Sequence, residues 1–206
     1  MTNLLVVEKV IKSYKKTVVL ENVSLQIEDK GQIIQLKGIN GSGKSTLFKL
    51  IAGLEKPDSG KILLSSNTNL GALIENPGFL ENFSLAYNLR YLASIKSRLN
   101  EAYAEKLCQM LALDLHSHTK MKNYSVGMRQ KAGIIQAIME KQNLILLDEP
   151  SRGLDQESLQ KFVTLMNQLR QEGRNIIIAS HEEYEEMKID ECLKIEHGIL
   201  SPISDR

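Results

Sequence analysis

Gly38–Thr46, with the sequence GINGSGKST, is the stretch that decides the fold. It matches the pattern G-x-x-x-x-G-K-S, in which glycines let the backbone curl until successive N–H groups point inward at an anion. Lys44 brings a positive charge to the β- and γ-phosphates of a nucleotide, and the Ser45 hydroxyl can ligate Mg²⁺. The stretch therefore predicts a phosphate-binding loop.

The residues on either side of this loop support the prediction. Gln32–Lys37 has the composition of a buried strand, and Thr46–Ala52 has the apolar spacing of a helix. A helix that begins at the loop directs its N-terminal dipole at the phosphates. A glycine turn that joins a strand to a helix by chance would lack this context.

The composition limits the class of protein. The chain has 206 residues, 42% of them hydrophobic and 25% charged, which suits one well-buried core. A net charge of +1 argues against a nucleic-acid partner. The sequence has no apolar run of about eighteen residues and no basic, then apolar, N-terminus, so we expect neither a membrane span nor a secretory signal. Cys108 and Cys192 are isolated, which fits buried thiols in a reducing compartment.

The first part of the chain is rich in β-formers. Leu4–Ile11, Thr17–Ile27 and Ile33–Leu36 predict a small antiparallel sheet that leads into the first core strand. Tyr14 lies in the first turn, where it could stack on an adenine ring or close the edge of the sheet as a half-buried tyrosine.

The middle of the chain changes from strands to helix. Lys61–Ser65 and Asn69–Glu75 read as strands, and the pattern is helical from Ser84 to about Ala112. Leu113–Lys122 is polar and loop-like. We therefore expect a helical segment inserted between strands.

The last part alternates strands and helices again. Tyr124–Gly127 opens a helix, Asn143–Leu147 is a continuous apolar strand, a helix covers 155–171, Asn175–Ala179 is a strand, and a hairpin turns at His197–Gly198. This alternation predicts an α/β fold with a parallel sheet.

Two carboxylates follow the apolar strand of the last part. Asp148 and Glu149 stand at its carboxyl end, where open α/β sheets bind ligands. Asp148 is suited to hold Mg²⁺ opposite Ser45. Glu149 is suited to accept a proton from an attacking water.

The motifs together resemble those of ABC-type ATPases over essentially the whole chain. Tyr124–Lys131 occupies the place of the L-S-G-G-Q signature, at the family's spacing from Asp148–Pro150. Ser151–Asp155 resembles the D-loop, Ser180–His181 the switch histidine, and Gly71–Phe79 the Q-loop.

The resemblance implies a P-loop NTPase fold: a parallel-sheet core, an N-terminal antiparallel β-subdomain and an inserted α-helical lobe. We expect one domain over residues 1–206, with residues 1–75 and 143–206 as the catalytic core. The helical lobe would cover about 76–142 and end in the signature helix.

The resemblance also implies ATP and Mg²⁺ as ligands and assigns roles to residues. Tyr14 would stack on the adenine, His181 would contact the γ-phosphate, and Asp155 would communicate with a partner chain. The expected catalytic residues are Glu149, His181 and Glu75, and the expected Mg²⁺ ligands are Ser45, Asp148 and Glu75. The expected nucleotide contacts are Tyr14, Gly38, Asn40, Gly41, Ser42, Gly43, Lys44, Ser45, Thr46, Ser125, Gly127 and Asp155.

The signature implies a second chain. Ser125 is a good N-cap and Gly127 leaves backbone N–H groups exposed, which makes a second anion site. In this family that site serves the nucleotide of a partner, so we expect a head-to-tail homodimer, or a paired ATPase subunit, that buries ATP between the chains.

Three positions depart from the family pattern. Glu75 replaces glutamine, Val126 replaces the first signature glycine, and Met128 replaces the signature glutamine. The form Y-S-x-G-M, with the segment from Gly71 to Phe79, looks like the subgroup that exports bacitracin and lantibiotic-like peptides.

The expected function is an ATP-hydrolysing subunit at the cytoplasmic face of the membrane that powers a separate permease, for self-immunity or resistance. The alternatives are a soluble ABC protein acting on ribosomes or DNA, and a degenerate nucleotide-binding scaffold. An apolar groove is expected to receive the permease. It would be formed by the exposed members of a cluster that also supplies the core of the lobe, namely Phe79, Leu80, Phe83, Leu85, Tyr87 and Leu89.

Overall fold

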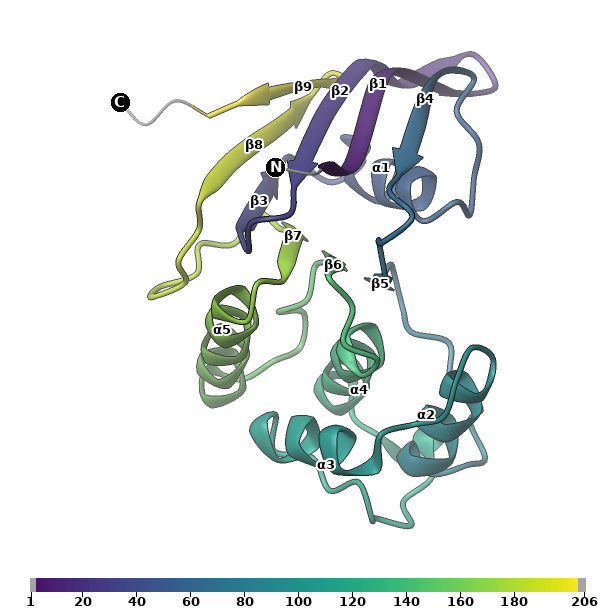
Figure 1. The fold of residues 1–206 in the computed structure, drawn as a ribbon, viewed down its shortest axis with the longest axis vertical. Coiled ribbons are helices and arrows are strands. Elements are labelled where there is room, and N and C mark those ends of the chain that lie inside the picture. The colour runs from purple at the N-terminus through teal and green to yellow at the C-terminus, as the bar shows by residue number, and fades with distance from the viewer. Residues whose placement is uncertain (1–2, 204–206) are drawn as a thin grey trace.

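A computed structural model describes residues 3–203. Figure 1 shows strands gathered at one end of the molecule and most of the helices at the other. The described strands form a three-stranded sheet of order β2-β1-β4 and a six-stranded sheet of order β5-β6-β7-β3-β8-β9. The α/β fold with a separate antiparallel sheet is therefore confirmed.

The three-stranded sheet is a long hairpin with one added strand. Strand β1 (Asn3–Tyr14) pairs antiparallel with β2 (Thr17–Glu28) and with β4 (Ser59–Leu64). Tyr14 is the last residue of β1 and pairs with Thr17 across the turn. The expected antiparallel sheet thus gains β4 from later in the chain.

The six-stranded sheet is parallel except at its last strand. Strands β6 and β7 are buried at every residue, which suits strands covered on both faces. Strand β9 turns back antiparallel on β8. The strands of this sheet are β3 (Ile33–Lys37), β5 (Leu70–Leu73), β6 (Leu144–Asp148), β7 (Asn175–Ala179), β8 (Glu191–Glu196) and β9 (Ile199–Pro202).

Side-chain caps mark where most of the helices begin. The side chain before each of α2, α3, α4 and α5 accepts a hydrogen bond from the first turn, whereas α1 begins at a glycine. The helices are α1 (Lys44–Ile51), α2 (Leu85–Ser94), α3 (Glu101–Met110), α4 (Val126–Ile138) and α5 (Gln156–Gln171), with a 3₁₀ turn at Met121–Asn123.

The helical pattern from Ser84 to Ala112 is two helices and not one. Helix α2 ends at Ser94, and the Asn100 side chain accepts a hydrogen bond from the Tyr103 N–H to start α3. Asparagine prefers this capping position to a helix interior, because its side chain competes for backbone groups. The expectation of continuous helical structure was therefore wrong at residues 95–100.

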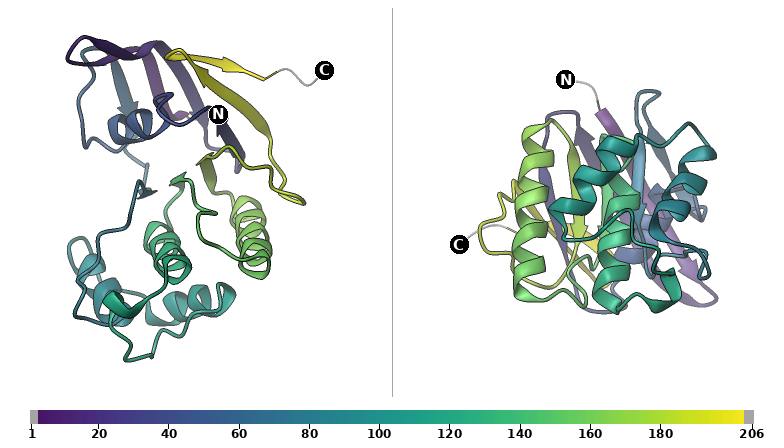
Figure 2. Two further views of the ribbon diagram at one scale, coloured as in Figure 1. Left: turned by 180° about the vertical axis from the view of Figure 1, so that it is seen from behind. Right: turned by 90° about the horizontal axis from the view of Figure 1, so that it is seen from below.

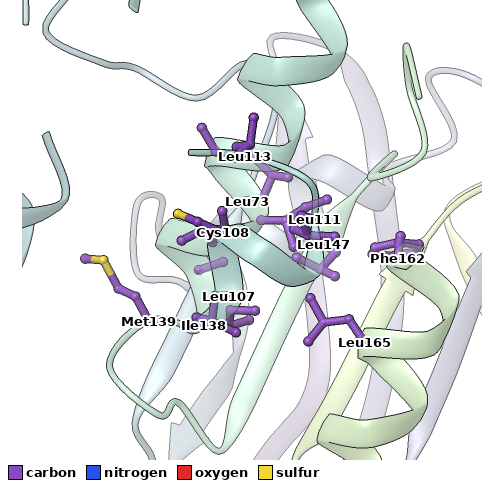
Figure 3. Close-up of a cluster of buried hydrophobic side chains, with 14 of the residues drawn as sticks. Leu73, Leu107, Cys108, Leu111, Leu113, Ile138, Met139, Leu147, Phe162 and Leu165 are labelled. Atoms are coloured by element: carbon purple, nitrogen blue, oxygen red, sulfur yellow. The ribbon is translucent and has the colours of Figure 1, made fainter. Parts of the chain in front are cut away.

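The core has two clusters that share the strands of the parallel sheet. Along β6, Leu144 and Leu146 face the cluster under the antiparallel sheet and α1, whereas Ile145 and Leu147 face the helices. This division follows from the alternation of side chains along a strand. Figure 3 shows part of the second cluster, where Leu147 meets side chains of α3, α4 and α5. The views in Figure 2 show these helices grouped on the side away from the antiparallel sheet.

The two cysteines differ in their burial. Cys108 is buried among α3 and α4 side chains, and this burial raises its pKa to about 12. Cys192 is only half-buried, so the expectation of two buried thiols holds for Cys108 alone. Within residues 3–203, no helix combines the length and apolar character needed to cross a bilayer.

Candidate nucleotide-binding site

A cavity of about 530 Å³ opens beside the start of α1 and the carboxyl ends of β5 and β6. It brings together the phosphate loop, the first tyrosine, the end of β5 and the acidic pair, which lie far apart in the sequence. The lining residues are Tyr14, Val19, Asn40, Gly41, Gly43, Lys44, Ser45, Thr46, Glu75, Asn76, Gln130, Asp148, Glu149 and Arg152.

The phosphate loop depends on glycine at its last turn. Gly43 precedes α1 with a φ of 108°, which side chains other than hydrogen rarely permit. A Cβ at this position would also lie 2.8 Å from a methyl carbon of Leu20. Gly43 therefore lets the loop close against β2 while α1 begins at Lys44.

The Lys44 side chain lies inside the phosphate loop and hydrogen-bonds its backbone. Its side chain is 6% exposed, and Nζ donates to the Gly38 carbonyl at 2.7 Å and to the Ile39 carbonyl at 3.3 Å. The same nitrogen lies 3.9 Å from Glu149 Oε1. The ammonium group is thus held at the centre of the loop with carbonyl and carboxylate oxygens around it.

Asp148 and Ser45 both line the cavity. Burial raises the pKa of Asp148, and the hydrogen bond with the Ser45 side chain and the Lys44 charge oppose that shift. A buried carboxylate with a raised pKa gains from a bound cation. No cluster of three His, Cys, Asp or Glu side chains suited to a metal occurs in residues 3–203. The Ser45 hydroxyl and Asp148 carboxylate fit Mg²⁺, which proteins bind through one or two carboxylates together with substrate phosphates.

Glu149 lies between Lys44 and His181. The His181 Nδ1 atom is 3.3 Å from Glu149 Oε2, although the His181 side chain is 65% exposed. Glu149 has a φ of 45°, and its N–H donates to the Ala179 carbonyl at 2.8 Å. Gln130 Nε2 donates to the Glu149 carbonyl at 3.0 Å, so β7 and α4 together fix the Glu149 backbone.

Glu75 follows β5 in a left-handed conformation, with φ 58°. Its backbone helps to lower the pKa of the Asp148 carboxyl, and its own carboxylate lies 2.6 Å from Lys49 Nζ. Tyr14 bounds the cavity as well, and its hydroxyl donates to Glu55, a bond that raises the pKa of Tyr14. Tyr14 is 42% exposed, and Lys12 Nζ lies over its ring at 5.3 Å from the centroid. A partly exposed ring at the cavity edge suits stacking on a flat group.

Several predicted residues lie outside the cavity lining. Ser125 caps α4 by accepting a hydrogen bond from the Met128 N–H at 3.2 Å. A Cβ on Gly127 would meet the Gly153 carbonyl at 2.4 Å, so Gly127 permits a close approach of backbones. Asp155 caps α5, and the bonds from Ser158 lower its pKa. The others outside the lining are Gly38, Ser42 and His181.

Sequence reasoning missed other lining residues. Val19, Asn76, Gln130 and Arg152 all border the cavity. Asn76, Gln130 and Arg152 lie inside motifs that we identified, and the position of Gln130, on the inner side of the signature helix, follows from helical spacing. Val19 lies in β2, outside every motif, and borders the cavity only because β2 packs beside the phosphate loop.

Comparisons with known proteins agree with this geometry. Residues 20–152 match the family model described as ABC transporter. The Bacillus subtilis (strain 168) protein YdbJ, described as an uncharacterized ABC transporter ATP-binding protein, is 34% identical over 79% of this chain and 56% of its own length. The bacitracin transport ATP-binding protein BcrA of Enterococcus faecalis is 32% identical over 92% of this chain and 65% of its own length. The lantibiotic transport ATP-binding protein SrtF of Streptococcus pyogenes is 31% identical over 86% of this chain and 80% of its own length.

A solved structure described as the ATP-binding subunit of an ABC transporter has the same fold. It superposes with a TM-score of 0.84 at 28% identity and covers 98% of this chain and 90% of its own. The chain nevertheless spans only 56% and 62% of the lengths of two of its Bacillus subtilis relatives. Motifs, cavity and relatives agree: the chain belongs to the ABC transporter family, as an ATP-binding cassette of the ABC ATPase fold.

Proposed function

We propose that this chain binds and hydrolyses ATP to power a separate permease that exports an antimicrobial peptide or a similar compound. The convergence of Lys44, Asp148 and Glu149 on one cavity carries the proposal. The matches to a bacitracin and a lantibiotic transport protein support the choice of cargo.

The residues around the cavity have complementary tasks in hydrolysis. Lys44 binds the β- and γ-phosphates, and Ser45 and Asp148 would hold Mg²⁺. The predicted role of Glu75 as a further ligand would require its carboxylate to leave Lys49 Nζ, which lies 2.6 Å away. Bound Mg²⁺ neutralises charge on the phosphate oxygens. Glu149 accepts the proton of the attacking water, and His181, 3.3 Å away, contacts the γ-phosphate.

A dimer follows from the position of the signature. Val126, in the first turn of α4, is 65% exposed, and neither Ser125 nor Gly127 lines the chain's own cavity. An exposed helix start with a free N-terminal dipole suits the phosphates of a nucleotide held by a second chain. We therefore propose a head-to-tail dimer that encloses ATP at both contacts.

Ser125→Arg should block this dimer, whereas Met128→Gln should change the ATPase rate only modestly. Met128 packs against the helix-side core, so its side chain is not needed at the phosphates. An arginine at Ser125 would place a long side chain in the contact and remove the α4 cap. The measurements are ATP-dependent dimerisation by size-exclusion chromatography and the rate of phosphate release. A severe loss from Met128→Gln in a folded protein would contradict this assignment.

The predicted permease surface is only partly exposed. Phe79, Leu85 and Leu89 are buried in the core of the lobe, and the exposed members of the group are Leu80, Phe83 and Tyr87. Phe83 and Tyr87 are 42% and 45% exposed and stack with ring centroids 4.1 Å apart. This stacked pair, with Leu80, is the apolar surface that we propose for the permease at the inner face of the membrane.

The double variant Phe83→Asp, Tyr87→Asp should keep the ATPase activity of the purified chain and abolish peptide resistance in cells that carry the permease. Two charges on an apolar contact oppose its desolvation. Ile199→Asp is the control, because Ile199 is also exposed but lies on β9, far along the sheet. Resistance equal to that of the wild-type chain, or co-sedimentation of the chain with ribosomes and never with membranes, would overturn the transporter proposal.

A further inference from the structure

The Glu75 side chain forms an ion pair that the Q-loop motif does not predict. Its Oε1 atom lies 2.6 Å from Nζ of Lys49, although the Glu75 side chain is 60% exposed and could extend into solvent. Lys49 belongs to no motif that we identified in the sequence. The ion pair therefore joins the end of β5 to the last turns of α1.

This ion pair lies beside the groups that would hold Mg²⁺. Ser45 and Lys49 are four residues apart in α1, so they lie on the same side of the helix. Glu75 and Asp148 line the same cavity. The pair is therefore one helical turn from Ser45 and shares the cavity with Asp148.

The negative charge of the Glu75 carboxylate disfavours the binding of a nucleotide polyphosphate in this cavity. Glu75, Asp148 and Glu149 all line the cavity, and its basic lining residues are Lys44 and Arg152. A glutamine at position 75 would be neutral, whereas a carboxylate repels the polyphosphate of ATP through a partly aqueous medium. A fixed cation near Glu75 would offset that repulsion.

Lys49 is the basic group that can offset the negative charge of Glu75. Within residues 3–203, Lys49 is the one basic side chain at ion-pair distance from Glu75. The nearby Glu55 has partners of its own, because it accepts the Tyr14 hydroxyl and lies 3.8 Å from Lys12 Nζ. Removal of Lys49 would thus leave the Glu75 charge, and not the Glu55 charge, without a partner.

We propose that Lys49 is a positioning residue that holds and neutralises Glu75 and thereby sets the affinity of the cavity for the polyphosphate of ATP. This inference rests on the proposed function, since it concerns the same cavity. The compensating charge for the Glu75 carboxylate comes from the neighbouring helix α1.

A double-mutant cycle measures the coupling directly. The probe is a fluorescent N-methylanthraniloyl derivative of ATP, titrated in EDTA so that no metal takes part, at low and at high salt. Lys49→Ala should weaken binding roughly two- to fivefold at low salt, as expected for loss of a partly exposed ion pair, and less at high salt. In the Glu75→Gln background, Lys49→Ala should leave the affinity unchanged.

Lys61→Ala is the matched control. Lys61 pairs with Glu8 at 3.0 Å on the antiparallel sheet, away from the cavity lining, so its loss should not change the affinity in either background. Equal losses from Lys49→Ala in both backgrounds would mean that Lys49 contacts the nucleotide itself and would overturn the inference. Unchanged affinity in the wild-type background would overturn it too. If the wild-type chain shows no binding in EDTA, the same cycle is run with Mg²⁺. A wild-type chain that binds no nucleotide there either refutes the proposed function, and the inference fails with it.

Discussion

Lys44→Ala is expected to abolish ATP binding or reduce it to the limit of detection. The Lys44 ammonium is held at the centre of the phosphate loop by the Gly38 and Ile39 carbonyls, 2.7 and 3.3 Å away. Alanine removes the positive charge that faces the β- and γ-phosphates and leaves the Asp148 and Glu149 carboxylates without it. Isothermal titration calorimetry with ATP and Mg²⁺ measures the effect.

The control for this variant is Lys161→Ala. Lys161 pairs with Glu157 on α5 and does not line the cavity, so ATP affinity should be unchanged. Circular dichroism of both variants would show that the fold is intact. An ATP affinity of Lys44→Ala equal to that of the wild-type chain would remove the cavity from nucleotide binding.

Glu149→Gln should bind ATP but hydrolyse it about a hundredfold more slowly or worse, in line with the usual contribution of a general base. Glutamine keeps the size of the side chain and can still hydrogen-bond His181, whose Nδ1 lies 3.3 Å from Glu149 Oε2. It cannot accept the proton of the attacking water. The measurements are the rate of phosphate release and the Kd for ATP.

The same variant should also accumulate as a dimer, because slow hydrolysis leaves ATP between the chains. Size-exclusion chromatography with and without ATP tests this. Glu157→Gln is the control, since Glu157 is exposed on α5 and pairs with Lys161 outside the cavity. Wild-type turnover by Glu149→Gln would exclude Glu149 as the base.

The sequence alone was enough to predict the parts of the site that depend on local order. The phosphate loop follows from Gly43 and Lys44 between a strand and a helix, because close backbone turns and helix starts are set by neighbouring residues. The strand that ends at Asp148 follows from a continuous apolar run, since parallel strands are buried on both faces. These signals predicted the fold class, and the solved structure with a TM-score of 0.84 agrees.

The tertiary structure decided what depends on contacts between distant segments. Within the predicted apolar group after the Q-loop, Leu85 and Leu89 are buried and Tyr87 is exposed, because only one face of α2 meets the core. Lys49 and Glu75 are 26 positions apart by number, and each reads in the sequence as an ordinary surface charge. Their ion pair forms because α1 and the end of β5 approach the same cavity, a proximity set by the packing of both segments around the parallel sheet.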